Sequence, residues 1–206
     1  MKITFNLTLV SLLIGTGIFA QTLSPTSIEY FKNGIAKSTL GDYRGAIKDY
    51  NKVIELNPKN EGAYNIRGLA KYELGDYRGA IQDYNKAIEL NPEFKKAYYL
   101  RGNAKYDLDD YRGAIKDYNK AIELNPEDKD AYFDRGRAKY QLDDHRGAVE
   151  DFNKAIELNP KDEKSYYNRG LAKSMFGDTN GACLDLSKAG ELGLEKAYEA
   201  IKVLCN

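Results

Sequence analysis

The chain has 206 residues, and its 31 Lys and Arg balance its 31 Asp and Glu, so its formal net charge is zero. This balance argues against a nucleic-acid binder, and 42% hydrophobic residues are too many for a disordered chain and too few for a polytopic membrane protein. Two cysteines and one histidine, His145, exclude a disulfide-dense miniprotein, a four-cysteine zinc module and His-rich metal sites, and no cofactor is expected.

The first twenty residues differ in character from the rest of the chain. Lys2 precedes an apolar run over residues 3–19, and a polar stretch follows Ala20. This order is typical of a secretory signal peptide, so we expect cleavage after Ala20 and a short linker over residues 21–26. The chain would then be exported, to the periplasm or outside the cell, with no membrane span after cleavage. The alternative is an uncleaved membrane anchor, because a run of about 17 apolar residues is at the short limit for a span.

A 34-residue period runs through the rest of the chain. It is kept by the prolines of four Glu-Leu-Asn-Pro tetrapeptides, by a glycine and by an alanine: Pro58, Pro92, Pro126 and Pro160; Gly34, Gly68, Gly102, Gly136 and Gly170; Ala46, Ala80, Ala114, Ala148 and Ala182. A fixed period of this length indicates a repeat architecture. The five repeats cover residues 27–60, 61–94, 95–128, 129–162 and 163–196.

The pattern of each repeat predicts two helices. In the second repeat we expect a first helix over residues 63–74 and a second over residues 77–90. Gly75 suits the left-handed residue that ends a helix, Asp76 is a good N-cap, and Pro92 stops the second helix. One pair of helices cannot bury its apolar face alone, so neighbouring repeats must stack.

These residues resemble the tetratricopeptide repeat (TPR). The second repeat supplies the pattern of that family, with an arginine where leucine is usual before the glycine: Tyr64, Arg67, Gly68, Tyr72, Ala80, Tyr84, Ala87 and Pro92. The resemblance covers residues 27–196. It implies an all-α fold, a right-handed superhelical solenoid of five helix-turn-helix units, in which the first helices line a concave face.

The ends of the array are atypical, as a stack of repeats requires. The fifth repeat lacks the Asn-Pro ending, and Lys196 to Leu204 is predicted to form one more helix with Ala197, Ile201 and Leu204 on one face. We expect residues 196–206 to cap the last repeat.

The resemblance places three columns of side chains on the concave face. The predicted groove residues of these columns are Phe31, Asn65, Tyr99, Phe133 and Tyr167; Ile35, Leu69, Asn103 and Arg137; and Tyr72, Tyr106 and Tyr140. A groove of aromatic rings with a few amides and one arginine suits an extended peptide or a partner's helix. In the Tyr72 column, packing between helices and groove lining remain alternatives.

The predicted function is therefore that of an exported, non-enzymatic scaffold whose partner is another protein. One alternative is a binder of a cell-wall glycan, because tyrosines and amides also stack on and hydrogen-bond to sugars. A hydrolase is the second alternative, and the sequence shows no nucleophile motif, phosphate loop or metal spacing to support it. The family's clamp for the C-terminal carboxylate of chaperone tails does not match any window of this chain.

Two further predictions concern charged residues and cysteines. Recurring arginines on the first helices and aspartates on the second are expected to pair across repeat boundaries, because the first repeat has no arginine in this column: Asp49–Arg67, Asp83–Arg101, Asp117–Arg135 and Asp151–Arg169. Cys183 occupies a column of buried aliphatic residues and is expected to be buried and bonded to Cys205, joining the capping helix to the last repeat. Two free cysteines are the alternative.

Overall fold

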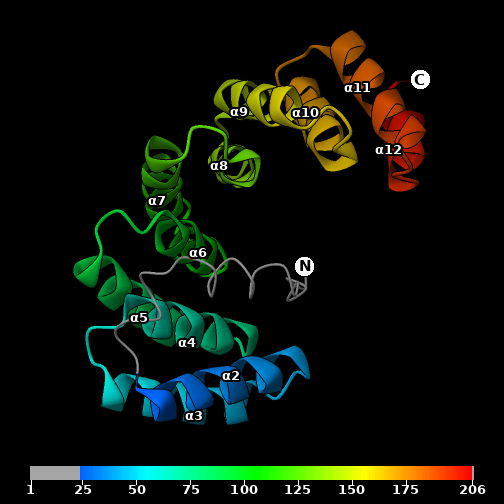
Figure 1. Ribbon diagram of the computed structural model, residues 1–206. Coiled ribbons are helices and arrows are strands. Elements are labelled where there is room, and N and C mark those ends of the chain that lie inside the picture. The colour runs from blue at the N-terminus through cyan, green and yellow to red at the C-terminus, as the bar shows by residue number, and fades with distance from the viewer. Residues whose placement is uncertain (1–23, 206) are drawn as a thin grey trace. The chain divides into compact units, whose positions relative to one another are not determined.

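The computed structural model describes residues 24–205, so the predicted signal peptide lies outside the described residues. Within this range all regular elements are helices: α2 (Pro25–Thr39), α3 (Tyr43–Leu56), α4 (Glu61–Glu73), α5 (Tyr77–Leu90), α6 (Lys95–Tyr106), α7 (Tyr111–Leu124), α8 (Lys129–Gln141), α9 (His145–Leu158), α10 (Glu163–Met175), α11 (Thr179–Glu191) and α12 (Lys196–Leu204) (Figure 1). The predicted all-α fold of paired helices is confirmed.

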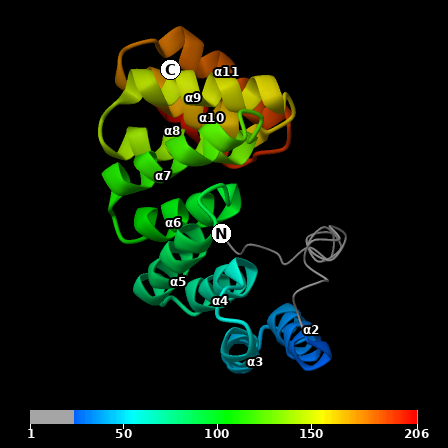
Figure 2. The same cartoon turned by 60° about the vertical axis from the view of Figure 1, so that its left-hand side comes forward.

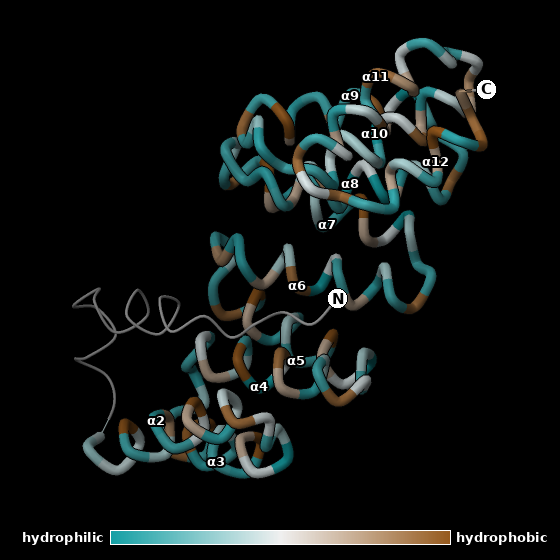
Figure 3. Tube along the Cα trace, turned by 90° about the vertical axis from the view of Figure 1, so that its right-hand side faces the viewer, coloured by the Kyte–Doolittle hydropathy of each residue, from teal (hydrophilic) through white to brown (hydrophobic). Residues whose placement is uncertain are grey.

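The helices belong to two compact parts, which divide within α6 after Ala104. The N-terminal part contains α2 to α5 and most of α6, and the C-terminal part contains α7 to α12. In both parts the two helices of a repeat lie side by side, as α2 and α3 or α10 and α11 show (Figure 2). Hydrophobic and hydrophilic stretches alternate along the helices, as amphipathic helices require (Figure 3).

Local sequence signals set the turn between the paired helices. The side chain of Asp42 accepts a hydrogen bond from the Gly45 amide at 2.9 Å, and the same cap begins every second helix. Gly75 precedes its cap with a φ of +79°, in the left-handed region that favours glycine. Asp109 and Asp143 take this conformation in the third and fourth repeats, with φ of 59° and 61°.

The core of each pair is an aromatic ring of the second helix packed on a glycine of the first. A Cβ atom on Gly68 would lie 2.8 Å from Cε1 of Tyr84, and one on Gly136 would lie 2.9 Å from Cε1 of Phe152. Only glycine leaves room for these rings, which are fully buried. The recurring glycine therefore specifies a close approach of two helices rather than a turn.

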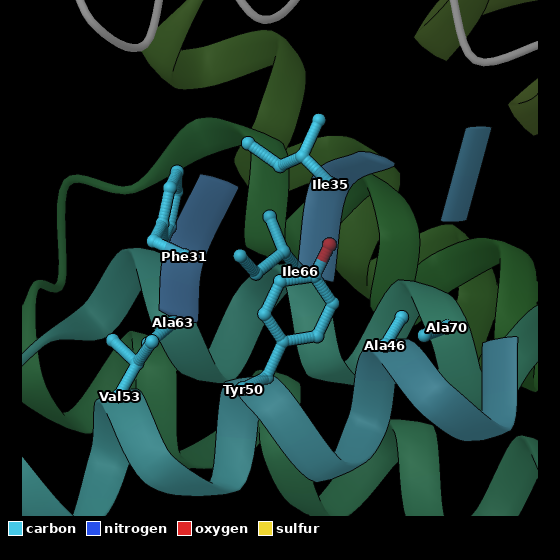
Figure 4. Close-up of a cluster of buried hydrophobic side chains, with 8 residues drawn as sticks. All are labelled: Phe31, Ile35, Ala46, Tyr50, Val53, Ala63, Ile66 and Ala70. Atoms are coloured by element: carbon cyan, nitrogen blue, oxygen red, sulfur yellow. The ribbon is translucent and has the colours of Figure 1, made fainter. Parts of the chain in front are cut away.

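Successive repeats share one core, as predicted. Tyr50 of α3 lies among side chains of α2 and α4, and Val53 packs with Ala63 and Ile66 of the next repeat (Figure 4). In the C-terminal part, α7 packs on α8, α9 on α10, and α11 on α12. Each second helix is thus covered by the first helix of the following repeat, and α12 covers the last one.

The C-terminal end contains a disulfide between Cys183 of α11 and Cys205 after α12, with the two Cα atoms 5.8 Å apart. Cys183 is only partly buried, although its column predicted full burial. Ala197 of α12 is fully buried, and the ring of Tyr198 lies over Gly190, where earlier repeats have isoleucine.

The predicted ion pairs across repeat boundaries are wrong. Arg67 binds Asp83 of its own repeat through Nε at 2.9 Å and Nη2 at 2.5 Å, and the same two contacts join Arg135 to Asp151 and Arg169 to Asp185. Asp49 is paired with Lys37 at 2.7 Å, so the first repeat does not need an arginine for its aspartate. The lysines in the column of Lys37 also reach the aspartate of their own repeat, as Lys71 reaches Asp83 at 2.8 Å.

Candidate binding surface

The structure buries four of the predicted groove residues in the N-terminal part. Phe31 and Ile35 are each 9% exposed and belong to the core around Tyr50, whose ring lies 6.4 Å from that of Phe31. Leu69 and Asn65 are each 7% exposed, and Leu69 packs with Tyr84. Phe31, Ile35 and Leu69 are therefore core residues, because the stacking of repeats covers the apolar positions of the first helices.

Three predicted residues of the N-terminal part are partly buried: Tyr72, Tyr99 and Asn103. The ring of Tyr72 lies 5.2 Å from that of Tyr77, the first residue of α5. The Nζ atom of Lys96 lies 4.9 Å from the ring centroid of Tyr99, within the range of a cation–π contact. Tyr99 thus presents a ring that packs on the core on one side and carries a lysine on another.

The same arrangement recurs in the C-terminal part. Tyr106 packs on Tyr111 with ring centroids 5.2 Å apart, and Tyr140 packs on His145 at 5.0 Å. The packing expected as one alternative for the Tyr72 column is thus observed, and groove lining stays a prediction. Each ring packs on the first aromatic residue of its own second helix and keeps part of its surface exposed.

Arg137 of α8 is the charged member of the predicted groove residues. Its guanidinium lies 4.5 Å from the ring centroid of Tyr106 and 6.0 Å from that of Phe133. Its Nη1 donates to Asp134 Oδ1 at 2.9 Å, and the side chain is 35% exposed. A guanidinium has five N–H donors, and the hydrogen bond to Asp134 engages one of them. Arg137 can therefore donate hydrogen bonds to a ligand.

The carboxylate beside Arg137 is unusual for its position. Asp134 is 4% exposed and stands in the column of the buried Ile66 and Leu100. Burial lowers the pKa of Arg137, but the charge of Asp134, its hydrogen bond and the neighbouring tyrosines Tyr106 and Tyr118 together outweigh burial, so the pKa is raised and the guanidinium stays charged. The aspartate thus keeps the arginine in its charged form at the edge of the core.

Two lysines and one aspartate contact predicted groove residues but were not themselves predicted from the sequence. Lys196, the first residue of α12, lies with Nζ 4.2 Å from the ring centroid of Tyr167, much as Lys96 lies over Tyr99. The available signal for Asp134 was its charge in an otherwise apolar column. The lysines gave no signal, because each is an ordinary exposed residue near the start of a helix.

Residues 24–205 contain neither a metal-binding cluster nor a membrane-spanning helix. In this range no three His, Cys, Asp or Glu side chains gather as a metal ion would require. Nor does any helix in it have the length and apolarity of a membrane span. His145 lies with Nε2 3.8 Å from the exposed Asp143, and its ring packs at a tilt against that of Tyr140.

Comparisons with known families place the repeats. A family model described as TPR repeat matches residues 39–75 and 68–109. Two models described as Tetratricopeptide repeat match residues 99–163 and 152–183. None of the curated proteins matches the chain in sequence.

Solved structures agree in fold. The crystal structure of a MamA protein is 31% identical over 85% of this chain and 96% of that chain, with a TM-score of 0.76. MamA from Desulfovibrio magneticus RS-1 is 21% identical over 85% of this chain and 98% of that chain, with a TM-score of 0.79. YrrB, described as a TPR protein with an unusual peptide-binding site, is 24% identical over 85% and 92% of the two chains, with a TM-score of 0.74.

Proposed function

The chain belongs to the tetratricopeptide-repeat family, and from this premise we propose that it is an exported, non-enzymatic scaffold that binds a peptide or helix of a partner protein. Its solved relatives support the general role of a protein-interaction scaffold. Export is proposed from the signal-peptide pattern of residues 1–20.

The position and charge of the Arg137 guanidinium are the single observation that carries the proposal. In the C-terminal part its charged guanidinium lies near the partly exposed rings of Tyr106 and Phe133 and donates one hydrogen bond to Asp134. Rigid aromatic rings bury large areas at a low cost in conformational entropy, and a guanidinium can donate to a backbone carbonyl or a carboxylate. A polypeptide offers both kinds of group.

The likeness to YrrB favours a peptide as the ligand. That protein is described as having an unusual peptide-binding site, and it shares the fold of this chain. In the present chain the corresponding ligand would lie along α8 and α10, whose partly exposed residues include Phe133, Arg137 and Tyr167.

The test starts from the partner itself. The mature protein is cross-linked in its own cell envelope, and the captured protein is identified and purified. Its affinity is then measured for the wild type and for Phe133→Ala, Arg137→Ala and Tyr167→Ala. We expect each variant to weaken binding by about 1 kcal/mol or more, as central anchors do.

Arg112→Ala is the matched control, because Arg112 is exposed on the second helix of the third repeat. Circular dichroism should show that every variant keeps its helix content. If the variants bind the purified partner with the affinity of the wild type, the binding surface lies elsewhere. Loss of binding in Arg112→Ala as well would point to general electrostatic attraction instead.

A further inference from the structure

The last helix, α12, occupies the place of a first helix that has no repeat of its own. In the N-terminal part, Val53 of α3 is covered by Ala63 and Ile66 of the following first helix. Ala189 stands in the column of Val53, α12 packs on α11, and Ala189 and Ala197 are both fully buried. An Ala-Tyr pair also occurs at 197–198, two residues before the register of the pairs at 63–64, 97–98 and 131–132.

Few contacts hold α12 in this place. It has nine residues and no side-chain N-cap, and isolated helices of this length are not stable in water. Of its apolar residues only Ala197 is fully buried, while Ile201 and Leu204 are partly buried and Val203 is 79% exposed. No further helix follows it within the described residues. The helix is thus supported on one side only.

The disulfide secures the C-terminal end of α12. The N-terminal end is held by the chain itself, where the Leu194 amide donates to the Ala189 carbonyl at 3.0 Å. At the other end, Cys205 is joined to Cys183 of α11 across a sequence separation of 22 residues. A disulfide across a loop of this length lowers the equilibrium constant for detachment of α12 from α11 by roughly two orders of magnitude.

We propose that the Cys183–Cys205 disulfide is a redox-sensitive latch that holds α12 on α11, and that its reduction releases α12 while the other helices keep their structure. A dithiol reductant supplies the chemistry. Its two sulfurs form a new S–S bond, the Cys183–Cys205 bond breaks, and the two protons of the dithiol go to the cysteine sulfurs.

Release of α12 would change the surface at the end of the repeat array. The contact between Tyr198 and Gly190 would open, and Ala189, which is fully buried, would reach solvent. The inner face of α12 would be exposed at the same time. Loss of the latch therefore uncovers an apolar helix face that the oxidised protein conceals.

Hydrogen exchange of the full mature chain, followed by mass spectrometry, tests the proposal with dithiothreitol as the dithiol. Labelling of free thiols first establishes that the bond has been reduced. We expect the amides of α12 to exchange at least tenfold faster after reduction, with no change in α7 to α9. Cys205→Ser should show the same fast exchange without reductant, and reductant should not alter it further.

Three outcomes would overturn the latch. Unchanged protection of α12 in the fully reduced protein would show that packing alone holds it. Fast exchange spreading through α7 to α9 would show that the bond supports the whole C-terminal part. A bond that dithiothreitol does not reduce in the folded protein would show that it is a permanent crosslink.

Discussion

Arg67 donates through Nη1 to Asn51 Oδ1 at 2.7 Å, so it reaches back across a repeat boundary while Nε and Nη2 hold Asp83 of its own repeat. The same backward contact, also at 2.7 Å, joins Arg101 to Asn85, Arg135 to Asn119 and Arg169 to Asn153. The guanidinium therefore links three helices. It binds a carboxylate within the repeat and an amide in the preceding one.

Removal of the corresponding arginine of the fourth repeat, Arg135, should destabilise the C-terminal part. In Arg135→Ala, the nearly buried Asp151 keeps only Lys139, at 2.9 Å, as its cation. Leaving a buried carboxylate short of partners is costly, so we expect the free energy of unfolding to fall by about 2–4 kcal/mol. Urea denaturation followed by circular dichroism measures the change.

Two further variants give that result its meaning. Asn119→Ala removes only the contact across the boundary and should cost about 1 kcal/mol. Arg112→Ala, on the exposed surface, should stay within about 0.5 kcal/mol of the wild type. Equal losses in Arg135→Ala and Arg112→Ala would show that the arginine column is only a solvated surface.

A methyl group on Gly136 should force apart the two helices of the fourth repeat. Its Cβ would lie 2.9 Å from Cε1 of Phe152, a ring that is fully buried and cannot move aside. Overpacking of this kind costs about 1–3 kcal/mol, so Gly136→Ala should unfold at lower urea concentrations.

The pair of variants Phe152→Leu and Gly136→Ala/Phe152→Leu isolates the clash. The fifth repeat has Leu186 opposite Gly170, so leucine is a natural occupant of this position. The added alanine should cost less in the leucine background than in the wild type. An identical cost in both backgrounds would assign the effect to helix propensity or to another neighbour.

Alkaline pH should weaken the first repeat through Tyr50. Burial raises the pKa of Tyr50 to about 12, although its hydrogen bond with Ser38 acts in the opposite direction. The unfolded tyrosine ionises near its ordinary pKa of about 10, so the contribution of Tyr50 to stability is complete below that pH and is lost as the pH rises toward about 12. In Tyr50→Phe the fall in unfolding free energy between about pH 10 and 11 should be smaller by about 1 kcal/mol. Parallel pH curves for the two proteins would contradict this explanation.

The mature protein should begin at Gln21. A signal peptidase favours a small residue before the cleaved bond, and Ala20 supplies it. Mass spectrometry of protein isolated from the cell envelope should find the first twenty residues missing. Detection of an intact Met1 peptide would favour the uncleaved anchor instead.

The helical part of the structure follows closely from the repeat pattern. The second helix of the second repeat was expected over residues 77–90 and is Tyr77–Leu90, because Asp76 caps its start and the chain turns before Pro92. The first helix begins two residues earlier than expected, at Glu61, because Asn60 accepts from the Ala63 amide at 3.0 Å and caps it. Short-range signals of this kind are readable in a single chain.

Contacts between helices were harder to predict. The absence of an arginine at Asn33 suggested correctly that this column reaches the preceding repeat, but the partner is an asparagine rather than an aspartate. Asp49 and Asn51 both lie on α3, and spacing along the chain does not say which side chain faces Arg67. Phe31, Ile35 and Leu69 were misplaced in the groove for the same reason, since Phe31 fits an open face and a covered one equally well by residue type.

The backward contact of the arginines makes the interior repeats interchangeable. Each carries one donor toward its predecessor and one acceptor toward its successor, while the array ends carry Asn33 and Ser187 in those columns. Deletion of residues 95–128 would place Asn85 sixteen residues before Arg135, the spacing that the present contacts use. Whole repeats can therefore be lost or gained in steps of 34 residues without stranding a guanidinium. The number of interior repeats can therefore vary. The first and last repeats, which each lack one of the two contact residues, cannot take the place of an interior repeat.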